Sequence, residues 1–392
     1  MIELKNKSDC CGCTACYSIC PKNAITLKSD SEGFLYPTIA KKSCVECGLC
    51  EKVCPIINKK TIEAKVKRAF LVQNTDEKIL RESTSGGAFS AIARYVLKHG
   101  GIVFGAAFDD KFRVIHTCAE KEADLSVFRN SKYVQSNPLA TYSETKQLLK
   151  SGRMVCYSGT PCQIEGLKQF LGKEYDNLIT VDVVCRAVPS PGVWNSYMKL
   201  VSEHNPVSSV HFRDKAFGYQ YSTMEIKSKN GNTNRSGIEQ NQWLRLFFSG
   251  LIIRPSCTKC KFRSPDRVSD FTIWDCFNAH KFRTKLNEKK GITRVLIHTP
   301  KAKAIIDALH DDLIIEEIPY AIAIDGVKEM KESPKMHEKH KKFYEDYNTL
   351  TFGDLLQKYV PITVKVRAKT IARRGLNFMG LDVLIKRAMR KG

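Results

Sequence analysis

Cysteines crowd the beginning of the chain in two runs of equal spacing. Nine of the sixteen cysteines fall before residue 55. The first run is Cys10, Cys13, Cys16 and Cys20, followed by Pro21, and the second is Cys44, Cys47, Cys50 and Cys54, followed by Pro55. Both runs fit C-x2-C-x2-C-x3-C-P, which is a spacing that binds four-iron clusters through thiolates.

The fourth cysteine of each run is expected to bind the cluster that the other run holds. Three cysteines on a tight loop reach three irons of one cube, whereas a fourth, one helical turn later, points toward a second cube. The predicted ligand sets are Cys10, Cys13, Cys16 and Cys54, and Cys44, Cys47, Cys50 and Cys20. Structural zinc prefers separated C-x2-C pairs that total four ligands, so zinc is the weaker interpretation. Cys11 is surplus and is interpreted as a bystander.

Residues 1–60 are therefore predicted to form a two-cluster 4Fe-4S ferredoxin-type domain. Beyond them, apolar segments of strand and helix spacing alternate, which is typical of an α/β fold with a largely parallel sheet. Residues 207–235 have a hairpin pattern instead, so the predicted class is α/β with α+β portions and a mixed sheet. The expected further units are 61–150, 151–335 and a basic helical tail at 336–392.

Three loops at predicted strand ends carry candidate cofactor-binding residues. The residues are Ser83, Ser85, Gly86 and Gly87 in the first loop, Gly159, Thr160 and Pro161 in the second, and Arg186 in the third. Each loop follows or precedes a predicted helix, whose N-terminal N–H groups suit a phosphate. Plain helix capping is the alternative interpretation for each loop.

Four later cysteines form a candidate third metal site. Cys162 and Cys185 follow two predicted strands at the same sheet edge, and Cys257 and Cys260 form a C-x2-C pair. Together they would supply four thiolates. The alternative is that the pair binds zinc alone or nothing, with Cys162 and Cys185 buried as small apolar residues. Cys276 competes for one position, while Cys118 and Cys156 are expected in the core.

Charge and hydropathy restrict the cellular location and the partners expected for the protein. The formal net charge is +22, and clusters would lower it by a few units. No apolar leader precedes Cys10 and no run is long enough to span a bilayer, so we expect a cytoplasmic protein with reduced thiols. The basic amphipathic tail predicts peripheral contact with the inner face of a membrane, or docking on a protein surface. A nucleic-acid partner is not expected, because charge alone suggests one and no recognition motif supports it.

Eight ordered segments resemble the coenzyme F-420 hydrogenase/dehydrogenase beta subunit family. They are SerThrSerGlyGly (83–87), SKYVQS (131–136), YSGTPCQIEGLKQFL (157–171), NLITVDVVC (177–185), VPSPGVW (188–194), FRDKAFGY (212–219), FFSGLIIRPSCTKC (247–260) and RVSDFTIWD (267–275). The likeness covers about residues 1 to 330. It extends to bacterial relatives that are associated with polysaccharide biosynthesis.

The resemblance implies an iron-sulfur flavoprotein oxidoreductase. It implies FAD, a third 4Fe-4S cluster at Cys162, Cys185, Cys257 and Cys260, and electron flow from ferredoxin or a hydrogenase/dehydrogenase subunit. The implied acceptor is organic, either deazaflavin-like or a polysaccharide-pathway substrate. Lys132, Arg186 and Arg213 are candidate contacts for phosphate or an anionic substrate, and Asp275 matches a cofactor-binding position.

Two departures from the family pattern lie at predicted strand ends. Arg186-Ala187 replaces the usual His-Gly after Cys185, and Trp274 replaces a glycine before Asp275. Both changes predict a remodelled acceptor pocket. They also keep open a second hypothesis, a non-catalytic iron-sulfur carrier or scaffold without flavin in a polysaccharide-biosynthesis complex.

Overall fold

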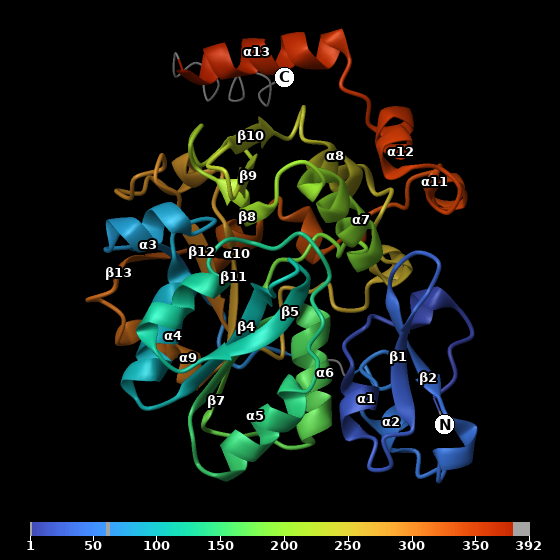
Figure 1. Cartoon of the computed structure of the whole chain (residues 1–392). Coiled ribbons are helices and arrows are strands. Elements are labelled where there is room, and N and C mark those ends of the chain that lie inside the picture. The colour runs from blue at the N-terminus through green and yellow to red at the C-terminus, as the bar shows by residue number, and fades with distance from the viewer. Residues whose placement is uncertain (1, 60–62, 379–392) are drawn as a thin grey trace.

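An eight-stranded mixed sheet organises most of the chain (Figure 1). The structure is a computed structural model that describes residues 2–59 and 63–378. The strand order is β13-β3-β12-β11-β7-β6-β4-β5, with parallel pairing from β11 to β4 and antiparallel pairing on both flanks. The bounds are β3 Arg68–Asn74, β4 Ile102–Phe108, β5 Val114–Ala119, β6 Val155–Gly159, β7 Leu178–Val183, β11 Phe271–Asp275, β12 Thr293–Ile297 and β13 Leu313–Ile318.

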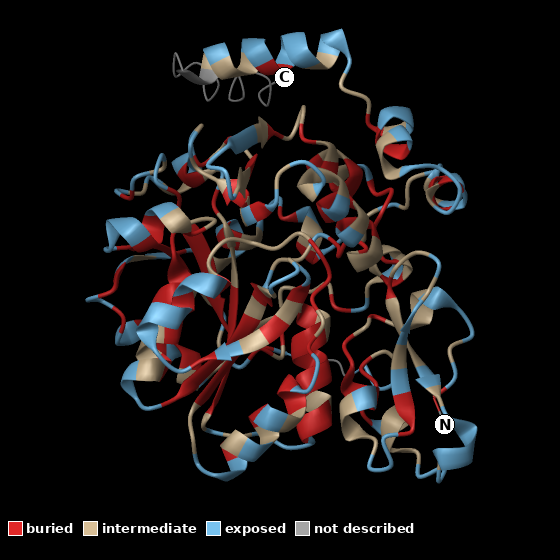
Figure 2. Cartoon of the chain, in the orientation of Figure 1, coloured by how far each residue is buried: buried red, intermediate tan, exposed pale blue. Residues whose placement is uncertain are grey.

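Helices cover both faces of this sheet. Helices α4 (Ala88–Lys98) and α9 (Pro300–Asp307) bury Ala91, Ile92 and Ile305 against one face. Helices α5 (Thr141–Lys150) and α6 (Pro161–Leu171) bury Tyr142, Ile164 and Leu167 against the other. The strands between them are largely buried, as Figure 2 shows. Apolar burial of this extent is the main favourable term in the stability of such a fold.

The N-terminal region forms a small unit beside α6 (Figure 1). It contains α1 (Ala15–Ile19), the hairpin β1 (Ile25–Ser29) and β2 (Leu35–Ile39), and α2 (Leu49–Lys52). The contact with α6 is close, because a Cβ added to Gly166 would lie 2.8 Å from Cys13 Cβ. Glycine at 166 therefore lets the cysteine loop reach the surface of α6.

A second sheet and a helical layer complete the chain. Strands β8 (Val207–Asp214), β9 (Thr223–Ser228) and β10 (Thr233–Gly237) form an antiparallel sheet. Trp194 and Trp243 lie in a shared core between α7 (Pro191–Ser202) and α8 (Gln242–Ser249), with ring centroids 4.8 Å apart. The remaining helices are α3 (Glu77–Glu82), α10 (Tyr320–Ile324), α11 (His340–Tyr347), α12 (Phe352–Tyr359) and α13 (Val364–Phe378).

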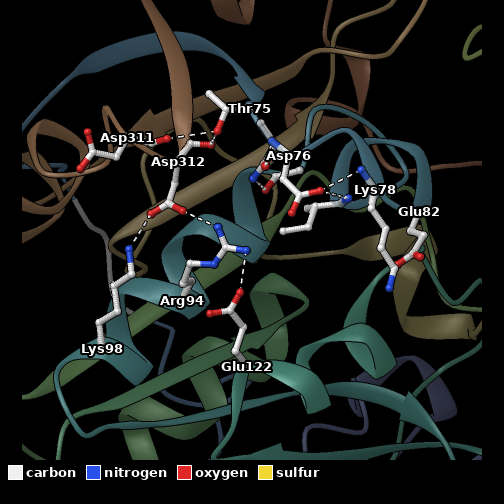
Figure 3. Close-up of polar contacts among 12 residues, drawn as sticks. Thr75, Asp76, Lys78, Glu82, Arg94, Lys98, Glu122, Asp311 and Asp312 are labelled. Atoms are coloured by element: carbon white, nitrogen blue, oxygen red, sulfur yellow. Dashed lines mark hydrogen bonds and ion pairs between the residues drawn. The ribbon is translucent and has the colours of Figure 1, made fainter.

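Ion pairs fix α4 to the segment that precedes β13. Arg94 Nη1 pairs with Asp312 Oδ1 at 2.5 Å and Arg94 Nη2 with Glu122 Oε1 at 2.7 Å (Figure 3). In the same region Asp76 caps α3, since its carboxylate accepts from the backbone N–H groups of Lys78 and Ile79. The ion pairs thus fix the second half of α4, and the cap fixes the start of α3.

The predicted fold class is confirmed, with two corrections in detail. The sheet is parallel only at its centre, because β3, β5, β12 and β13 pair antiparallel. Cys118 was expected in the core but is exposed, because β5 is an edge strand and one face of it meets solvent. Within the described ranges, no helix has both the length and the apolar composition needed to cross a bilayer.

A buried carboxylate fastens the two central strands β7 and β11 together. Asp270 Oδ2 accepts from Thr180 N and Thr180 Oγ1, each at 2.8 Å, and Asp270 Oδ1 accepts from Thr299 Oγ1 at 2.7 Å. Asp270→Ala would leave the buried Thr180 N–H without this partner. We expect the free energy of unfolding to fall by about 2 kcal/mol in urea titrations. The exposed Asp176→Ala is the control, and equal midpoints for the two variants would contradict this role.

Candidate iron-sulfur and cofactor site

The structure brings the first predicted ligand set together. Cys10, Cys13, Cys16 and Cys54 lie at the junction of α1, α2 and the start of the chain. Burial, followed by the neighbouring sulfurs of Cys10 and Cys54, raises the pKa of Cys16 to about 12. Buried thiols that raise one another's pKa need bound metal to exist as thiolates together. The grouping therefore suits a cluster, and ligation by these four residues remains a prediction.

The second predicted set lines a cavity at the outer end of the same unit. Cys20, Cys44, Cys47 and Cys50 all border it, together with Ile25 and Ile39. Cys47 is exposed, whereas Cys13, Cys16 and Cys54 of the first set are buried. The second set is thus closer to solvent, and the first set is closer to α6.

The third predicted set converges from three separate segments. Cys162 lies in the first turn of α6, Cys185 follows β7, and Cys257 and Cys260 lie in and after a short 3-10 helix, Pro255–Lys259. Burial raises the pKa of Cys185 well above its usual range, and the sulfurs of Cys257, Cys162 and Cys260 raise it further. The competing Cys276 lies instead in a separate apolar cluster with Leu71 and Ile292.

Cys11 lies between the first and third sets. Its sulfur contacts those of Cys13 and Cys162, and the contact with Cys11 is the largest cause that raises the pKa of Cys162. Burial is the second cause. The residue that the spacing leaves surplus therefore packs in one buried cluster with Cys13, Cys162 and Cys260.

The sulfur spacing favours clusters over zinc. Among the described residues, no three cysteine sulfurs lie within 4.8 Å of one another. Tetrahedral zinc, with Zn–S bonds of about 2.3 Å, requires its thiolates to be about that close. A cubane binds each thiolate through a different iron and spreads them further. The group that does satisfy the distance is His211, Asp214 and Glu225, where Arg235 and Lys227 already pair with the Glu225 carboxylate.

A buried guanidinium indicates that negative charge belongs at this junction. Arg254 is 1% exposed, and its Nε and Nη2 donate to Cys10 O at 2.8 Å and to Leu35 O at 3.0 Å. Among the residues that the structure describes, it has no carboxylate within ion-pair distance. An isolated buried charge is costly, so this arginine fits a site that holds anionic clusters beside it.

The first predicted cofactor loop, Ser83–Gly87, lies at the expected sheet edge. Ser85 Oγ shares a hydrogen bond with Thr293 Oγ1 at 2.8 Å, and Gly86 N donates to the same oxygen at 2.8 Å. A Cβ at Gly86 would lie 2.6 Å from Thr293 N, and Gly87 has φ +79°. Ser83 N donates to Ile79 O at the end of α3. Packing explains the two glycines, and the cofactor role stays a prediction.

Beside this loop, Arg213 keeps a donor free. It is 6% exposed, and its Nη1 donates to Asp275 Oδ2 at 2.9 Å and to Tyr133 Oη at 3.1 Å. Its Nη2 is buried and has no hydrogen-bond partner within the described part of the chain. Lys215 Nζ lies nearby, donating to Ser85 O, and burial lowers the pKa of Lys215 to about 8. Two cations, one with an orphaned donor, fit an anionic group such as a cofactor diphosphate.

The other residues predicted to contact the cofactor lie at the same edge of the sheet, and each has different hydrogen-bond or packing partners. Lys132 Nζ donates to Val127 O and Arg129 O, and burial lowers its pKa to about 7. Arg186 is half-exposed and lies over the Phe248 ring. Gly159, Thr160 and Pro161 lead into α6, where Thr160 forms a capping box and its Oγ1 lies 3.2 Å from Cys162 Sγ.

Aromatic rings connect the third cysteine set with Arg213. Tyr133 Oη accepts a hydrogen bond from Arg213 Nη1, and the Tyr133 and Phe247 ring centroids lie 5.2 Å apart. Phe247 and Tyr133 belong to the apolar cluster that contains Cys257. Sequence reasoning missed Tyr133 and Arg254 as site residues. For Arg254 a signal existed, because one cation interrupts the apolar run LIIRPSC directly before the C-x2-C pair.

Comparison with known proteins supports both halves of the site. Residues 152–321 match the family that is described as the C terminus of the beta subunit of coenzyme F420 hydrogenase/dehydrogenase. Residues 9–56 match the 4Fe-4S dicluster domain. The first match contains Cys162, Cys185, Cys257 and Cys260, and the second contains all eight cysteines of the N-terminal runs.

Two curated relatives come from Methanocaldococcus jannaschii. A coenzyme F420-dependent sulfite reductase is 27% identical over 175 residues, which cover 43% of this chain and 26% of the relative. The match thus spans about a quarter of that enzyme's length. An uncharacterized protein is 24% identical over 264 residues, covering 59% of this chain and 72% of the relative.

A solved structure of an F420-reducing NiFe hydrogenase complex from Methanosarcina barkeri is also similar. It has a TM-score of 0.41 and 17% identity, and covers 78% of this chain and 95% of that chain. The family matches indicate an iron-sulfur electron-transfer role in an oxidoreductase. The chain thus joins a region that matches a 4Fe-4S dicluster domain to a region that matches the C terminus of the coenzyme F420 hydrogenase/dehydrogenase beta subunit.

Proposed function

We propose that the chain is an iron-sulfur flavoprotein oxidoreductase that relays electrons from a protein donor to an organic acceptor. The observation that carries this proposal is the packing of the first cysteine set against the third, since Cys11 and Cys13 share one buried cluster with Cys162 and Cys260. Electron transfer requires closely spaced centres, and this packing supplies a continuous sequence of sites. The donor is ferredoxin or a hydrogenase/dehydrogenase subunit.

The exposure of the cysteines supports an order for the relay. Electrons enter at the set that contains Cys47, which is exposed and borders the outer cavity. They continue through the set that contains Cys13, which packs on α6, and then reach the set at Cys162. The basic charge of the chain suits an acidic donor at the outer site.

The edge around Arg213 and Lys215 is the proposed flavin site. FAD would supply the exchange between single electrons and a hydride. Arg213 Nη2 would donate to its phosphates, and Lys215, whose Nζ already donates to three backbone carbonyls, would add positive charge. The other predicted residues at this edge are Ser83–Gly87, Lys132, Gly159–Pro161, Arg186 and Asp275. Arg213 Nη1 also forms an ion pair with Asp275 Oδ2 at 2.9 Å.

A second candidate function has one observation in its favour. Asp275, directly after the departing Trp274, already accepts hydrogen bonds from Arg213 and Tyr219. A closed pocket there would leave an iron-sulfur carrier or scaffold without flavin in a polysaccharide-biosynthesis complex. Bound flavin separates the two proposals.

Metal and flavin content test the relay directly. Protein purified without oxygen is expected to contain about 12 iron atoms, as much acid-labile sulfide, and one FAD per chain. About 8 iron atoms and no flavin would contradict the relay and favour the carrier. Iron, sulfide and acid-released flavin are measured on the same preparation.

Neighbouring cysteines provide a matched test of ligand assignment. Cys13→Ala should lower iron by about four atoms per chain, because it removes a ligand of the first set. Cys11→Ala should leave iron at the wild-type value, although it lies two residues away. Equal iron loss in both variants would contradict the assignment.

Peripheral membrane contact through the tail is a separate proposal. In α13, Val364 and Ile371 are 83% and 72% exposed, whereas Arg373 pairs with Glu239 and Arg374 Nη2 donates to Arg235 O. One face therefore docks on the β9–β10 region and another stays free. Residues 379–392 of the predicted amphipathic stretch lie outside the described residues.

Vesicle binding tests this proposal. The full chain should co-sediment with anionic phosphatidylserine vesicles at low salt and dissociate as salt rises. Truncation before Pro361 should abolish binding, and neutral vesicles are the control. Absence of low-salt binding by the full chain would contradict membrane contact.

A further inference from the structure

Arg254 is the most deeply buried cation at the junction of the N-terminal unit and the large sheet. All three of its guanidinium nitrogens donate hydrogen bonds: Nε to Cys10 O at 2.8 Å, Nη1 to Gln135 Oε1 at 2.9 Å, and Nη2 to Leu35 O at 3.0 Å. Nη2 also lies 3.5 Å from Cys10 Sγ. The side chain is thus fixed from both sides of the junction.

The surroundings of Arg254 are shaped for this one side chain. Its guanidinium carbon lies 4.2 Å from the Tyr36 ring centroid and 5.3 Å from that of Phe34. Gly12 has φ +72°, and a Cβ there would lie 2.9 Å from Arg254 Nη1. The cysteine loop therefore passes close to the guanidinium and to Gln135, where a larger residue at 12 would collide.

The backbone of Arg254 also belongs to the third cysteine set. Arg254 N donates to Val188 O, and Cys257 N donates to Arg254 O at 2.9 Å. The sulfurs of Cys10, Cys11 and Cys257 all stabilise the charged form of its side chain. One residue thus touches the first set through its side chain and the third set through its main chain.

We infer that Arg254 is a positioning residue that keeps a permanent positive charge between the first and third cluster sites and raises the midpoint potential of the cluster at Cys10. This inference rests on the proposed clusters. A guanidinium stays protonated when buried, so its charge does not change with pH. Low polarity at the junction strengthens its attraction for an added electron. Net charge and hydrogen bonds to sulfur are known determinants of cluster potential.

The functional consequence is a preferred direction of electron transfer. An electron arriving from the exposed second set would be drawn inward to the site beside Arg254, next to Cys162. The same residue also ties the N-terminal unit to the large domain, alongside the hydrogen bonds from Ser190 Oγ to Glu32 O and from Gly192 N to Gly33 O. Neither role requires Arg254 to contact a substrate.

Two variants remove the net charge in different ways. Arg254→Gln deletes it, whereas Gln135→Glu adds a carboxylate beside Nη1 and leaves the guanidinium in place. Arg254→Lys keeps the charge and loses the planar fork. Arg153→Gln is the control, because Arg153 pairs with Glu120 at the opposite sheet edge.

The readout is the midpoint potential in redox titrations followed by electron paramagnetic resonance, after iron and sulfide are counted. The signal that Cys13→Ala removes identifies the cluster at Cys10. Both Arg254→Gln and Gln135→Glu should lower its reduction equilibrium constant about tenfold, which is 59 mV for one electron. Arg254→Lys should shift it less, and Arg153→Gln should leave it unchanged.

The inference is overturned if iron-replete Arg254→Gln and Gln135→Glu both keep the wild-type potential. Should Arg254→Gln lose iron, Gln135→Glu decides alone, because it keeps the arginine. Absence of iron from the wild-type protein would instead overturn the proposed function. The two failures are therefore distinguishable.

Discussion

The Arg254 guanidinium joins the two halves of this protein. A cation that is 1% exposed and lacks a carboxylate partner among the described residues would destabilise the fold unless negative charge lay close by. Cys10 and Cys257 lie on its two sides, and bound clusters would supply that charge. This side chain contributes to the docking of the N-terminal unit, and together with Gln135 it leaves no room for a side chain larger than glycine at position 12.

The candidate cluster and cofactor residues of the large domain lie at one edge of its sheet. Its central strands are parallel, so the segments after β6, β7 and β11 end on the same side. Cys162, Cys185 and Asp275 all arise there, and antiparallel β12 and β3 bring Thr293 and the 83–87 loop beside them. Tyr133 and Phe247 fill the space between Cys257 and Arg213, so the cluster site and the proposed flavin site share one apolar wall.

Local patterns in the sequence predicted much of this arrangement, and long-range packing explains the rest. The fixed spacing of the cysteine runs identifies the N-terminal clusters, because cluster geometry is local. The alternation of strands and helices predicts the parallel centre of the sheet. A mixed sheet was predicted, but not which strands run antiparallel, because the direction of the apolar segments β3, β12 and β13 depends on distant partners. Arg254 and Cys11 were missed for the same reason, since their roles arise from contacts across more than 100 residues.

The central claim is that electrons pass from the N-terminal unit to the large domain through the third cysteine set. Freeze-quench electron paramagnetic resonance of Cys185→Ser, mixed with reduced ferredoxin and an acceptor dye without oxygen, tests this claim most directly. The account predicts that both N-terminal clusters become reduced at the wild-type rate while acceptor reduction is lost. Acceptor reduction at the wild-type rate in this variant would contradict it, because electrons would then bypass the third set.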